Sequence, residues 1–293
     1  MKVLVIGSDG QLGSEIKELV SNYSKLEFVF KDLPDLDICD ADLLNSFIKE
    51  NNINAVINCA AYTAVDKAEQ NFEISEQVNS GGVKNLTNAL EKVDGKLIHI
   101  STDYVFDGSN SEPYKESDPV NPLGAYGKTK RDGELFVINS AIDSIVIRTS
   151  WLYSSFGNNF VKTMLRLGYK KNLLSVISDQ IGTPTYARDL AKVCLDLISI
   201  SCVERMSKKG KVYHYSNEGV TSWYDIAITV MELSGSNCKV KAIQTTDYPT
   251  LAKRPYYSVL NKTKIKKDFI IDIPYWKDSL KDCINKLKQW SGI

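Results

Sequence analysis

Short apolar runs alternate with longer amphipathic stretches through the first half of the chain. An uninterrupted apolar run bounded by turn residues is typical of a parallel strand buried on both faces. Such runs predict five strands, at residues 2–7, 26–30, 55–60, 96–101 and 144–150. Between them, helices are predicted after residue 11, over 41–51 and 73–92, and from 126 onward. This alternation predicts an α/β fold with a doubly wound parallel sheet.

The pattern loosens after Trp151, where the turn-rich segments DQIGTPT and AKRPYYS occur. We therefore expect residues 1–150 to form the sheet domain. Residues 151–293 are expected to form a smaller, less regular portion that binds the substrate, with some of its segments returning to the first domain.

Charge and hydropathy narrow the classes of partner. Lys+Arg and Asp+Glu are equal at 36 each, so no global basic field favours nucleic acid or an anionic membrane. No apolar run approaches the roughly 18 residues that span a bilayer. The apolar run in MKVLVIGSDG is short and no small-residue cleavage site follows it. We expect a cytoplasmic protein with no nucleic-acid or membrane partner.

Cysteine and histidine give no metal site. The chain has no CxxC, and its cysteines predict reduced, mostly buried thiols. His99 and His214 lie in strand-like runs, which favours structural roles in the core. The six cysteines are Cys39, Cys59, Cys194, Cys202, Cys238 and Cys283.

A glycine loop follows the first predicted strand. GSDGQLG places Gly7, Gly10 and Gly13 between that strand and the first helix, where close approach of a pyrophosphate to the helix N-terminus is favourable. The spacing is GxxGxxG rather than GxGxxG, and glycines that only turn the chain are the alternative. Its place between a strand and a helix favours a dinucleotide. No GK[ST] follows, so a P-loop is excluded.

Tyr126 and Lys130 are four residues apart in a predicted helix, so both lie on one face. An ordinary surface helix would also explain the pair. A phenol has a pKa near 10, and an ammonium one turn away is expected to lower it. Such a tyrosine could exchange a proton at neutral pH.

Together, the GxxGxxG loop, a threonine at the end of a strand and YxxxK resemble the extended short-chain dehydrogenase/reductases. Further segments are similar to the dTDP-4-dehydrorhamnose reductase family and cover most of the chain in the right order. They are INCAAYTAVDKAE, ISTDYVFDG, NPLGAYGKTK, RTSWLYSSFGNNFVKTMLRL, SDQIGTPTYARDLA and AKRPYYSVLN.

The resemblance implies a Rossmann domain and NAD(P)H-dependent reduction of the C4 ketone of dTDP-4-dehydro-L-rhamnose to dTDP-L-rhamnose, a polysaccharide precursor. Tyr126 would then protonate the carbonyl oxygen. Lys130 would tune Tyr126 and bind the nicotinamide ribose. Thr102 would polarise the carbonyl, and Asp103 would contact the substrate. A strand end with a local turn is the structural alternative for Thr102 and Asp103.

Other roles are implied by the same resemblance. The further positions implied to bind the cofactor are Gln11, Leu12, Asp37, Ile38, Ala61, Tyr62 and Thr63. Trp151 would pack against the sugar, although a tryptophan after a strand also fits a core. Arg254 would face the diphosphate, since its planar fork suits phosphate oxygens; a surface salt bridge is the alternative.

Cofactor preference depends on the end of the second strand. NAD-preferring members carry an acid there that binds the ribose hydroxyls. LEFVFKD instead places Lys31 there, with Asp32 just beyond, which favours the 2′-phosphate of NADPH while leaving NADH open. Some family members bind magnesium between subunits through carboxylates. Glu15 matches one such position, but no full ligand set is identified, so Mg²⁺ and a homodimer stay open.

Three alternatives remain for the activity. The chain could reduce another 4-keto-6-deoxy nucleotide sugar, or act as an epimerase with no net oxidation. It could also be a non-catalytic regulatory subunit that binds NADP. The intact set of Thr102, Tyr126 and Lys130 argues against the regulatory subunit, because a binding module does not need an acid-tuned tyrosine, and it leaves the other two alternatives open.

Overall fold

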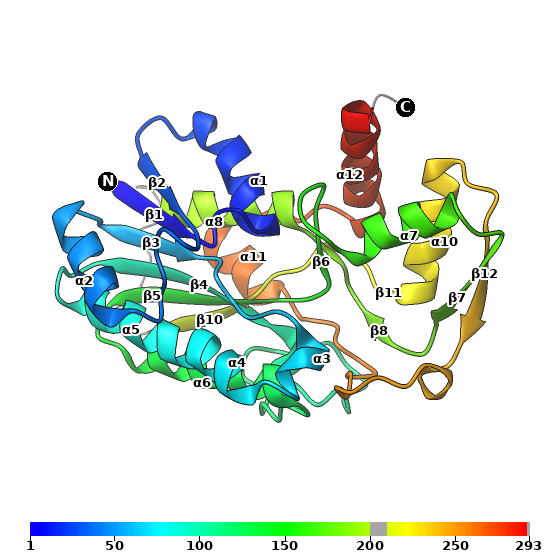
Figure 1. The fold of residues 1–293 in the computed structure, drawn as a ribbon, viewed down its shortest axis with the longest axis horizontal. Coiled ribbons are helices and arrows are strands. Elements are labelled where there is room, and N and C mark those ends of the chain that lie inside the picture. Colours follow the sequence, from blue (N-terminus) through cyan, green and yellow to red (C-terminus); the bar gives the residue numbers. More distant parts are fainter. Residues whose placement is uncertain (200–209, 292–293) are drawn as a thin grey trace.

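The computed structural model describes residues 1–199 and 210–291, so Cys202 lies outside the described residues. A six-stranded sheet, parallel throughout, has the order β10-β5-β4-β3-β1-β2 (Figure 1). The α/β doubly wound prediction is confirmed. The strands are β1 (Lys2–Ile6), β2 (Glu27–Lys31), β3 (Ala55–Asn58), β4 (Lys96–Thr102), β5 (Asp143–Thr149) and β10 (Lys211–His214).

Helices cover both faces of the sheet (Figure 1). On one face, α1 packs against α8, and Leu12 and Ile16 join the apolar side of α8 in a continuous core. On the other face, α2, α5 and α6 bury residues such as Leu44, Leu86 and Val137. The bounds are α1 (Gln11–Leu19), η1 (Val20–Asn22), α2 (Ala41–Glu50), α5 (Gly82–Glu91), α6 (Ala125–Asn139) and α8 (Ala187–Ile198).

Helical structure between residues 72 and 91 is less regular than the sequence predicts. It consists of α4 (Phe72–Glu76), a π-helical turn η2 (Gln77–Gly81) and α5. A single π turn inserted between α-helices is frequent at functional sites, because it re-aims side chains. The short helices α3 (Val65–Ala68) and η3 (Asp103–Val105) follow β3 and β4.

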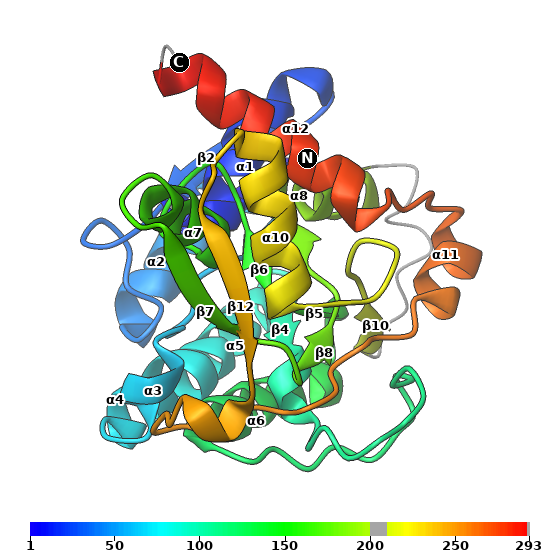
Figure 2. The ribbon, with the colours of Figure 1, turned by 90° about the vertical axis from the view of Figure 1, so that its right-hand side faces the viewer.

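A second, smaller lobe has its own core and lies beside the sheet (Figures 1 and 2). Its strands form three two-stranded sheets, β7–β12, β8–β11 and β6–β9. The strands are β6 (Leu152–Tyr153), β7 (Leu173–Ile177), β8 (Ile181–Gly182), β9 (Thr185–Tyr186), β11 (Thr221–Ser222) and β12 (Lys239–Ile243). The helices of this lobe are α7 (Phe160–Gly168), α10 (Trp223–Ser234), η4 (Thr245–Asp247) and α12 (Trp276–Ser291). The helix α11 (Thr263–Phe269) packs instead against β10 and the core of the large sheet.

The chain passes between the two lobes more than once. α8 and β10 follow the first strands of the small lobe, yet α8 covers the large sheet and β10 extends it beside β5.

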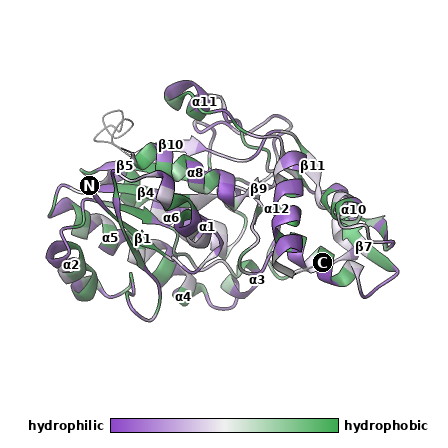
Figure 3. Ribbon diagram, turned by 90° about the horizontal axis from the view of Figure 1, so that it is seen from above, coloured by the Kyte–Doolittle hydropathy of each residue, from purple (hydrophilic) through white to green (hydrophobic). Residues whose placement is uncertain are grey.

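Surface helices such as α2 and α12 carry both hydrophilic and hydrophobic positions (Figure 3). Over residues 1–199 and 210–291, no helix has the length and apolar character needed to cross a membrane.

The positions of the histidines and cysteines agree with the roles predicted from the sequence. His99 and His214 are fully buried, which confirms their predicted place in the core. In the described part of the chain every cysteine is a free thiol, and Cys194, Cys238 and Cys283 are buried.

Candidate active site

The glycine loop joins β1 to α1 by a turn that larger residues could not make. Gly7 has φ +73°, and a Cβ on it would lie 2.5 Å from the Ala60 nitrogen. A Cβ on Gly13 would meet the carbonyl oxygen of Gly7 and lie 2.5 Å from Cα of Ser8. Gly10 precedes α1 without a side-chain cap, so the first N–H groups of the helix are left for an anion.

A cleft of about 320 Å³ opens beside this loop, between β1 and β3. The strand order reverses at this pair, and open α/β sheets bind ligands at such a point. Five predicted cofactor positions line the cleft: Gly7, Gly10, Asp37, Ile38 and Ala61. The side chain of Leu12 is buried in the core, so only its backbone could face a ligand.

Lys31 is held away from this cleft. Its ammonium lies 3.1 Å from Asp35 and 5.7 Å from the centre of the Phe47 ring. Asp32 lines the cleft instead, and its Oδ2 accepts a hydrogen bond of 2.8 Å from the backbone N–H of Asp9. Lys31 would therefore have to leave Asp35 to reach a phosphate.

The loop after β3 is fixed by Asn79, a residue for which the sequence predicts no role. The Asn79 side chain, in the π turn η2, accepts from the backbone N–H of Tyr62 (2.9 Å) and donates to its carbonyl oxygen (3.1 Å). It also donates to the hydroxyl of Thr129 (3.2 Å), next to Lys130. One buried amide thus holds both the loop at Tyr62 and the helix α6. Thr63 itself is exposed.

Thr102 and Tyr126 come together where β4 ends and α6 begins, and Lys130 lies one turn further along α6, beside Ile100 of β4. Thr102 is the last residue of β4 and is 5 % exposed. Lys130 is 2 % exposed, and its ammonium donates a 2.6 Å hydrogen bond to the Ile100 carbonyl. The pKa of Tyr126 is affected by the Thr102 hydroxyl, so these two side chains share one environment.

The pKa of Tyr126 is raised, whereas the sequence predicts that it is lowered. Burial, with the charge of Asp103, raises the pKa of Tyr126 to about 12, although the Thr102 hydroxyl opposes the shift. Burial also lowers the pKa of Lys130 to about 8. The prediction that the pKa of Tyr126 is lowered is therefore wrong for the protein without cofactor. Burial has the largest effect on this pKa, and the ammonium of Lys130 is hydrogen-bonded to the Ile100 carbonyl. A phenol with this pKa stays protonated at neutral pH, which is the form that a proton donor needs.

Asp103 lies beside the threonine. Its Oδ1 accepts a 3.1 Å hydrogen bond from the Thr102 hydroxyl, while its Oδ2 has no hydrogen-bond partner among the described residues. Burial raises the pKa of Asp103 to about 7, despite the opposing hydroxyls of Ser258 and Thr102. A buried carboxyl that titrates near neutrality beside a tyrosine is typical of functional sites.

A buried ion pair, which the sequence does not predict, anchors α6. Glu134, one turn beyond Lys130, accepts two 2.8 Å hydrogen bonds from Arg148 of β5. It also accepts from the Ser101 hydroxyl at 2.6 Å and from Arg131 at 2.8 Å. The one available signal was a charged residue, Arg148, inside an apolar strand, because such a charge needs a buried partner.

In the small lobe, Trp151 stacks on Trp223 with ring centres 3.9 Å apart. Trp151 has φ +49°, which is costly for a bulky residue and often marks a functional position. Trp223 lines a cavity of about 650 Å³ together with Gln180 and Arg254. An aromatic wall with a few polar groups is suited to a nucleotide or a sugar.

Arg254 lies between this cavity and Tyr104, which packs against Tyr126. Its guanidinium makes paired hydrogen bonds of 2.7 and 3.2 Å to Asp66. Burial and Asp103 raise the pKa of Tyr104, while Arg254 lowers it, and the ring of Tyr104 lies 5.6 Å from that of Tyr126. The salt bridge considered for Arg254 is thus present, and the residue also faces the cavity.

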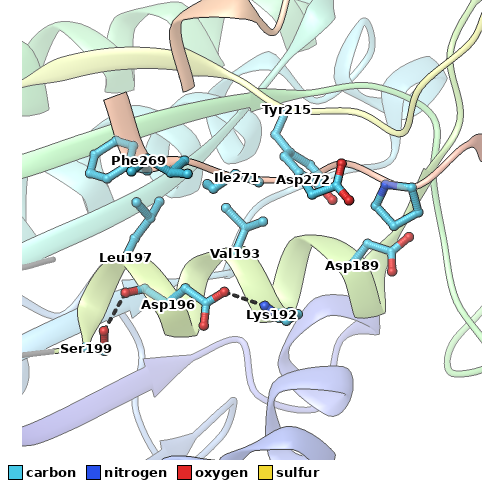
Figure 4. Close-up of a pocket in the computed structure, with 12 residues that line it drawn as sticks. Asp189, Lys192, Val193, Asp196, Leu197, Ser199, Tyr215, Phe269, Ile271 and Asp272 are labelled. Atoms are coloured by element: carbon cyan, nitrogen blue, oxygen red, sulfur yellow. Dashed lines mark hydrogen bonds and ion pairs between the residues drawn. The ribbon is translucent and has the colours of Figure 1, made fainter. Parts of the chain in front are cut away.

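Another cavity, of about 550 Å³, lies between α8 and residues 269–274 (Figure 4). It contains none of the predicted site residues. Asp196 on its wall bonds to Lys192 and to Ser199 within the same helix region (Figure 4). The cavity beside Trp223 is therefore the better candidate for the substrate.

Known proteins match this fold and this order of motifs. Residues 1–289 match the family described as "RmlD substrate binding domain". A dTDP-4-dehydrorhamnose reductase of Aggregatibacter actinomycetemcomitans is 41% identical over 287 residues, covering 96% of this chain and 97% of that protein.

Solved structures agree. A dTDP-4-dehydrorhamnose reductase of Clostridium acetobutylicum is 43% identical with a TM-score of 0.91, covering 98% of this chain and 100% of the other. One from Bacillus anthracis, solved in complex with NADP, is 34% identical, also with a TM-score of 0.91, covering 97% and 99%. The chain belongs to the dTDP-4-dehydrorhamnose reductase family.

Proposed function

We propose that the chain reduces the C4 ketone of dTDP-4-dehydro-L-rhamnose to give dTDP-L-rhamnose, with a nicotinamide dinucleotide as cofactor. The observation that carries the proposal is a protonated Tyr126 beside Thr102 at the end of β4, with the buried Lys130 one turn further along α6. Full-length similarity to reductases of this name supports it, as does the relative that is solved with NADP.

The residues around the glycine loop fit such a cofactor. The uncapped start of α1 offers N–H groups to a pyrophosphate, and the cleft between β1 and β3 offers room for the adenosine end. Residues 1–150 with α8 and β10 would form the cofactor lobe. The remaining residues would form most of the substrate lobe.

Tyr126 would donate its phenolic proton to the carbonyl oxygen. The cofactor supplies the hydride that is added to C4. Thr102 would donate a hydrogen bond to the same oxygen, where negative charge develops as the ketone becomes an alcohol. Lys130 would place its ammonium near the phenol and the nicotinamide ribose, so that the phenolate left after proton transfer is stabilised.

The sugar nucleotide would occupy the cavity beside Trp223. Trp151 would support the sugar through its stack on Trp223, and Arg254 at the rim would meet the diphosphate. Asp103, with its unpartnered Oδ2, would accept a hydrogen bond from a sugar hydroxyl.

A direct assay tests the proposal. We expect dTDP-4-dehydro-L-rhamnose to be reduced with one reduced nicotinamide oxidised for each sugar, followed by absorbance and product analysis. Other 4-keto-6-deoxy nucleotide sugars serve as comparisons. Sugar conversion without net oxidation would indicate an epimerase, and cofactor binding without turnover would indicate a regulatory subunit.

The pH dependence of the reaction is expected to reflect the ionisation of the Asp103 carboxyl group. Above its pKa of about 7, the carboxylate holds the Thr102 hydroxyl and places a negative charge near the developing alkoxide. We therefore expect kcat/KM to fall as pH rises through about 7, and Asp103→Asn to lack this inflection. The measurement is the pH profile of both proteins between about pH 5.5 and 8.5, on both sides of a pKa of about 7. An inflection retained in the variant would assign the titration to another group.

Cofactor preference is expected to depend on Lys31. A hydrogen bond to a charged group contributes about 1.5–3 kcal/mol, and 1.4 kcal/mol is about tenfold. At low salt we expect NADPH to be preferred by roughly tenfold, with Lys31→Ala levelling the two cofactors. Asp35→Asn should increase the preference, because it releases Lys31 from its ion pair. The measurement is kcat/KM with each cofactor at two salt concentrations. A wild-type preference for NADH would assign the ribose to Asp32.

A further inference from the structure

Four charged side chains join α1 to α8 and α12. They are Glu15 and Glu18 of α1, Arg188 of α8 and Lys286 of α12. Glu18 lies 2.6 Å from Arg188 and 2.5 Å from Lys286, and Glu15 lies 3.3 and 3.1 Å from the same two cations. We call these four residues the ion-pair joint. Figures 1 and 2 show the helices that it connects.

Glu15 is fully buried, and its hydrogen-bonding capacity is used. Its Oε1 accepts from the hydroxyls of Ser154 (2.6 Å) and Ser155 (3.2 Å). Its Oε2 accepts from Arg188 and Lys286. A carboxylate has about four lone-pair positions. The protein's own groups therefore occupy all of them.

This environment does not fit the magnesium that the family resemblance raised for Glu15. Magnesium takes oxygen ligands in nearly octahedral geometry at about 2.0–2.1 Å. Here the side chains at Oε2 are a guanidinium and an ammonium, which would repel a divalent cation. Over residues 1–199 and 210–291, no group of three or more acidic, histidine or cysteine side chains is placed to hold a metal ion.

We infer that Glu15 is the centre of an ion-pair joint within one chain, and that this chain does not use Glu15 to bind magnesium between subunits. The joint acts on the helix whose N-terminus follows the glycine loop. One turn earlier, Gln11 accepts a 2.9 Å hydrogen bond from Asn159 of the same small-lobe loop that supplies Ser154. The cofactor helix is thereby fixed to the small lobe by protein groups alone.

A metal titration of the wild-type protein tests the inference. The full chain is treated with EDTA, dialysed, and compared in MgCl₂ and in NaCl of equal ionic strength, because salt by itself screens ion pairs. We expect the same Tm and the same sedimentation coefficient in both. A site filled at about 100 times its Kd would instead raise Tm by about 5 °C or more. Such a rise, or a dimer that forms only with magnesium, would overturn the inference. Neither readout depends on the reductase activity.

Two variants test the joint itself. Arg188→Gln and Lys286→Gln each remove one cation from a buried carboxylate, and each is expected to lower Tm by about 5 °C. Lys281→Gln is the matched control, since Lys281 is exposed on the same helix as Lys286. A Tm equal to that of the control in both variants would show that the joint does not support the fold. If either variant fails to fold, the wild-type titration still decides whether magnesium is used.

Discussion

Replacement of Tyr126 by Phe is expected to lower kcat by about 10²–10⁴-fold, the usual contribution of a general acid. Burial keeps the phenol protonated at neutral pH, so the hydroxyl is the group that can supply the proton. The ring packs edge-to-face on Tyr104, and this contact survives in Phe. Cofactor affinity and Tm should therefore stay close to wild type. Stopped-flow turnover, a cofactor titration and a thermal melt measure the three quantities.

Tyr213→Phe is the matched control for this variant. Its hydroxyl donates a 2.9 Å hydrogen bond to Asp268, and Tyr213 lies on the edge strand β10, which β5 separates from β4. Loss of that hydroxyl should change stability slightly and leave kcat near wild type. Wild-type turnover by Tyr126→Phe would remove the tyrosine from the mechanism.

Glu134→Gln is expected to destabilise the fold by about 3–5 kcal/mol. The substitution keeps the size of the side chain but leaves the Arg148 guanidinium, which is 2 % exposed, without its counter-charge. Breaking one partner of a buried pair is costly for this reason. Urea unfolding at pH 7 measures the loss.

The stability lost in Glu134→Gln is expected to depend on pH. Burial tends to raise the pKa of Glu134, but the bonds from Arg148, Ser101 and Arg131 outweigh it and the pKa is lowered. The stability from the ionised carboxylate is full above its usual pKa and is lost as pH falls through the lowered value. The gap between wild type and Glu134→Gln should therefore shrink in acid.

Glu27→Gln gives the comparison at the surface. Glu27 pairs with Lys2 at 2.9 Å, but its side chain is 68% exposed. Such a pair contributes about 0–1 kcal/mol. Equal losses for Glu27→Gln and Glu134→Gln would contradict the importance assigned to burial.

Five of the six strands of the sheet were predictable because their apolar runs are short and separated by clear turn signals. The sixth strand, β10, and the covering helix α8 lie after Trp151, where the pattern is looser. KVLVI and SIVIRT are continuous or nearly so, as both-face burial requires. The glycine loop and the YxxxK pair were also readable, since each depends on spacing within one segment. Their place in the fold followed from the order of strands and helices.

The missed features depend on contacts between distant segments. Asn79 is one polar residue in a helical stretch, and only the π turn directs it to Tyr62 and Thr129. Lys31 ends a strand as expected, but its direction is set by Asp35 and Phe47, which a strand pattern does not reveal. The predicted direction of the Tyr126 pKa shift was wrong because spacing along a helix indicates that Lys130 is nearby but does not reveal how deeply the phenol is buried.

The return of α8 and β10 to the large sheet also has a consequence for synthesis on the ribosome. Until β10 emerges, β5 is an open edge whose unpaired backbone groups can join another chain. Until α8 emerges, the apolar side of α1 lacks its cover. The large lobe therefore cannot complete its fold as an early N-terminal unit, although N-terminal domains often fold first during translation. Its completion waits until the first elements of the small lobe, from β6 to β9, have also been made.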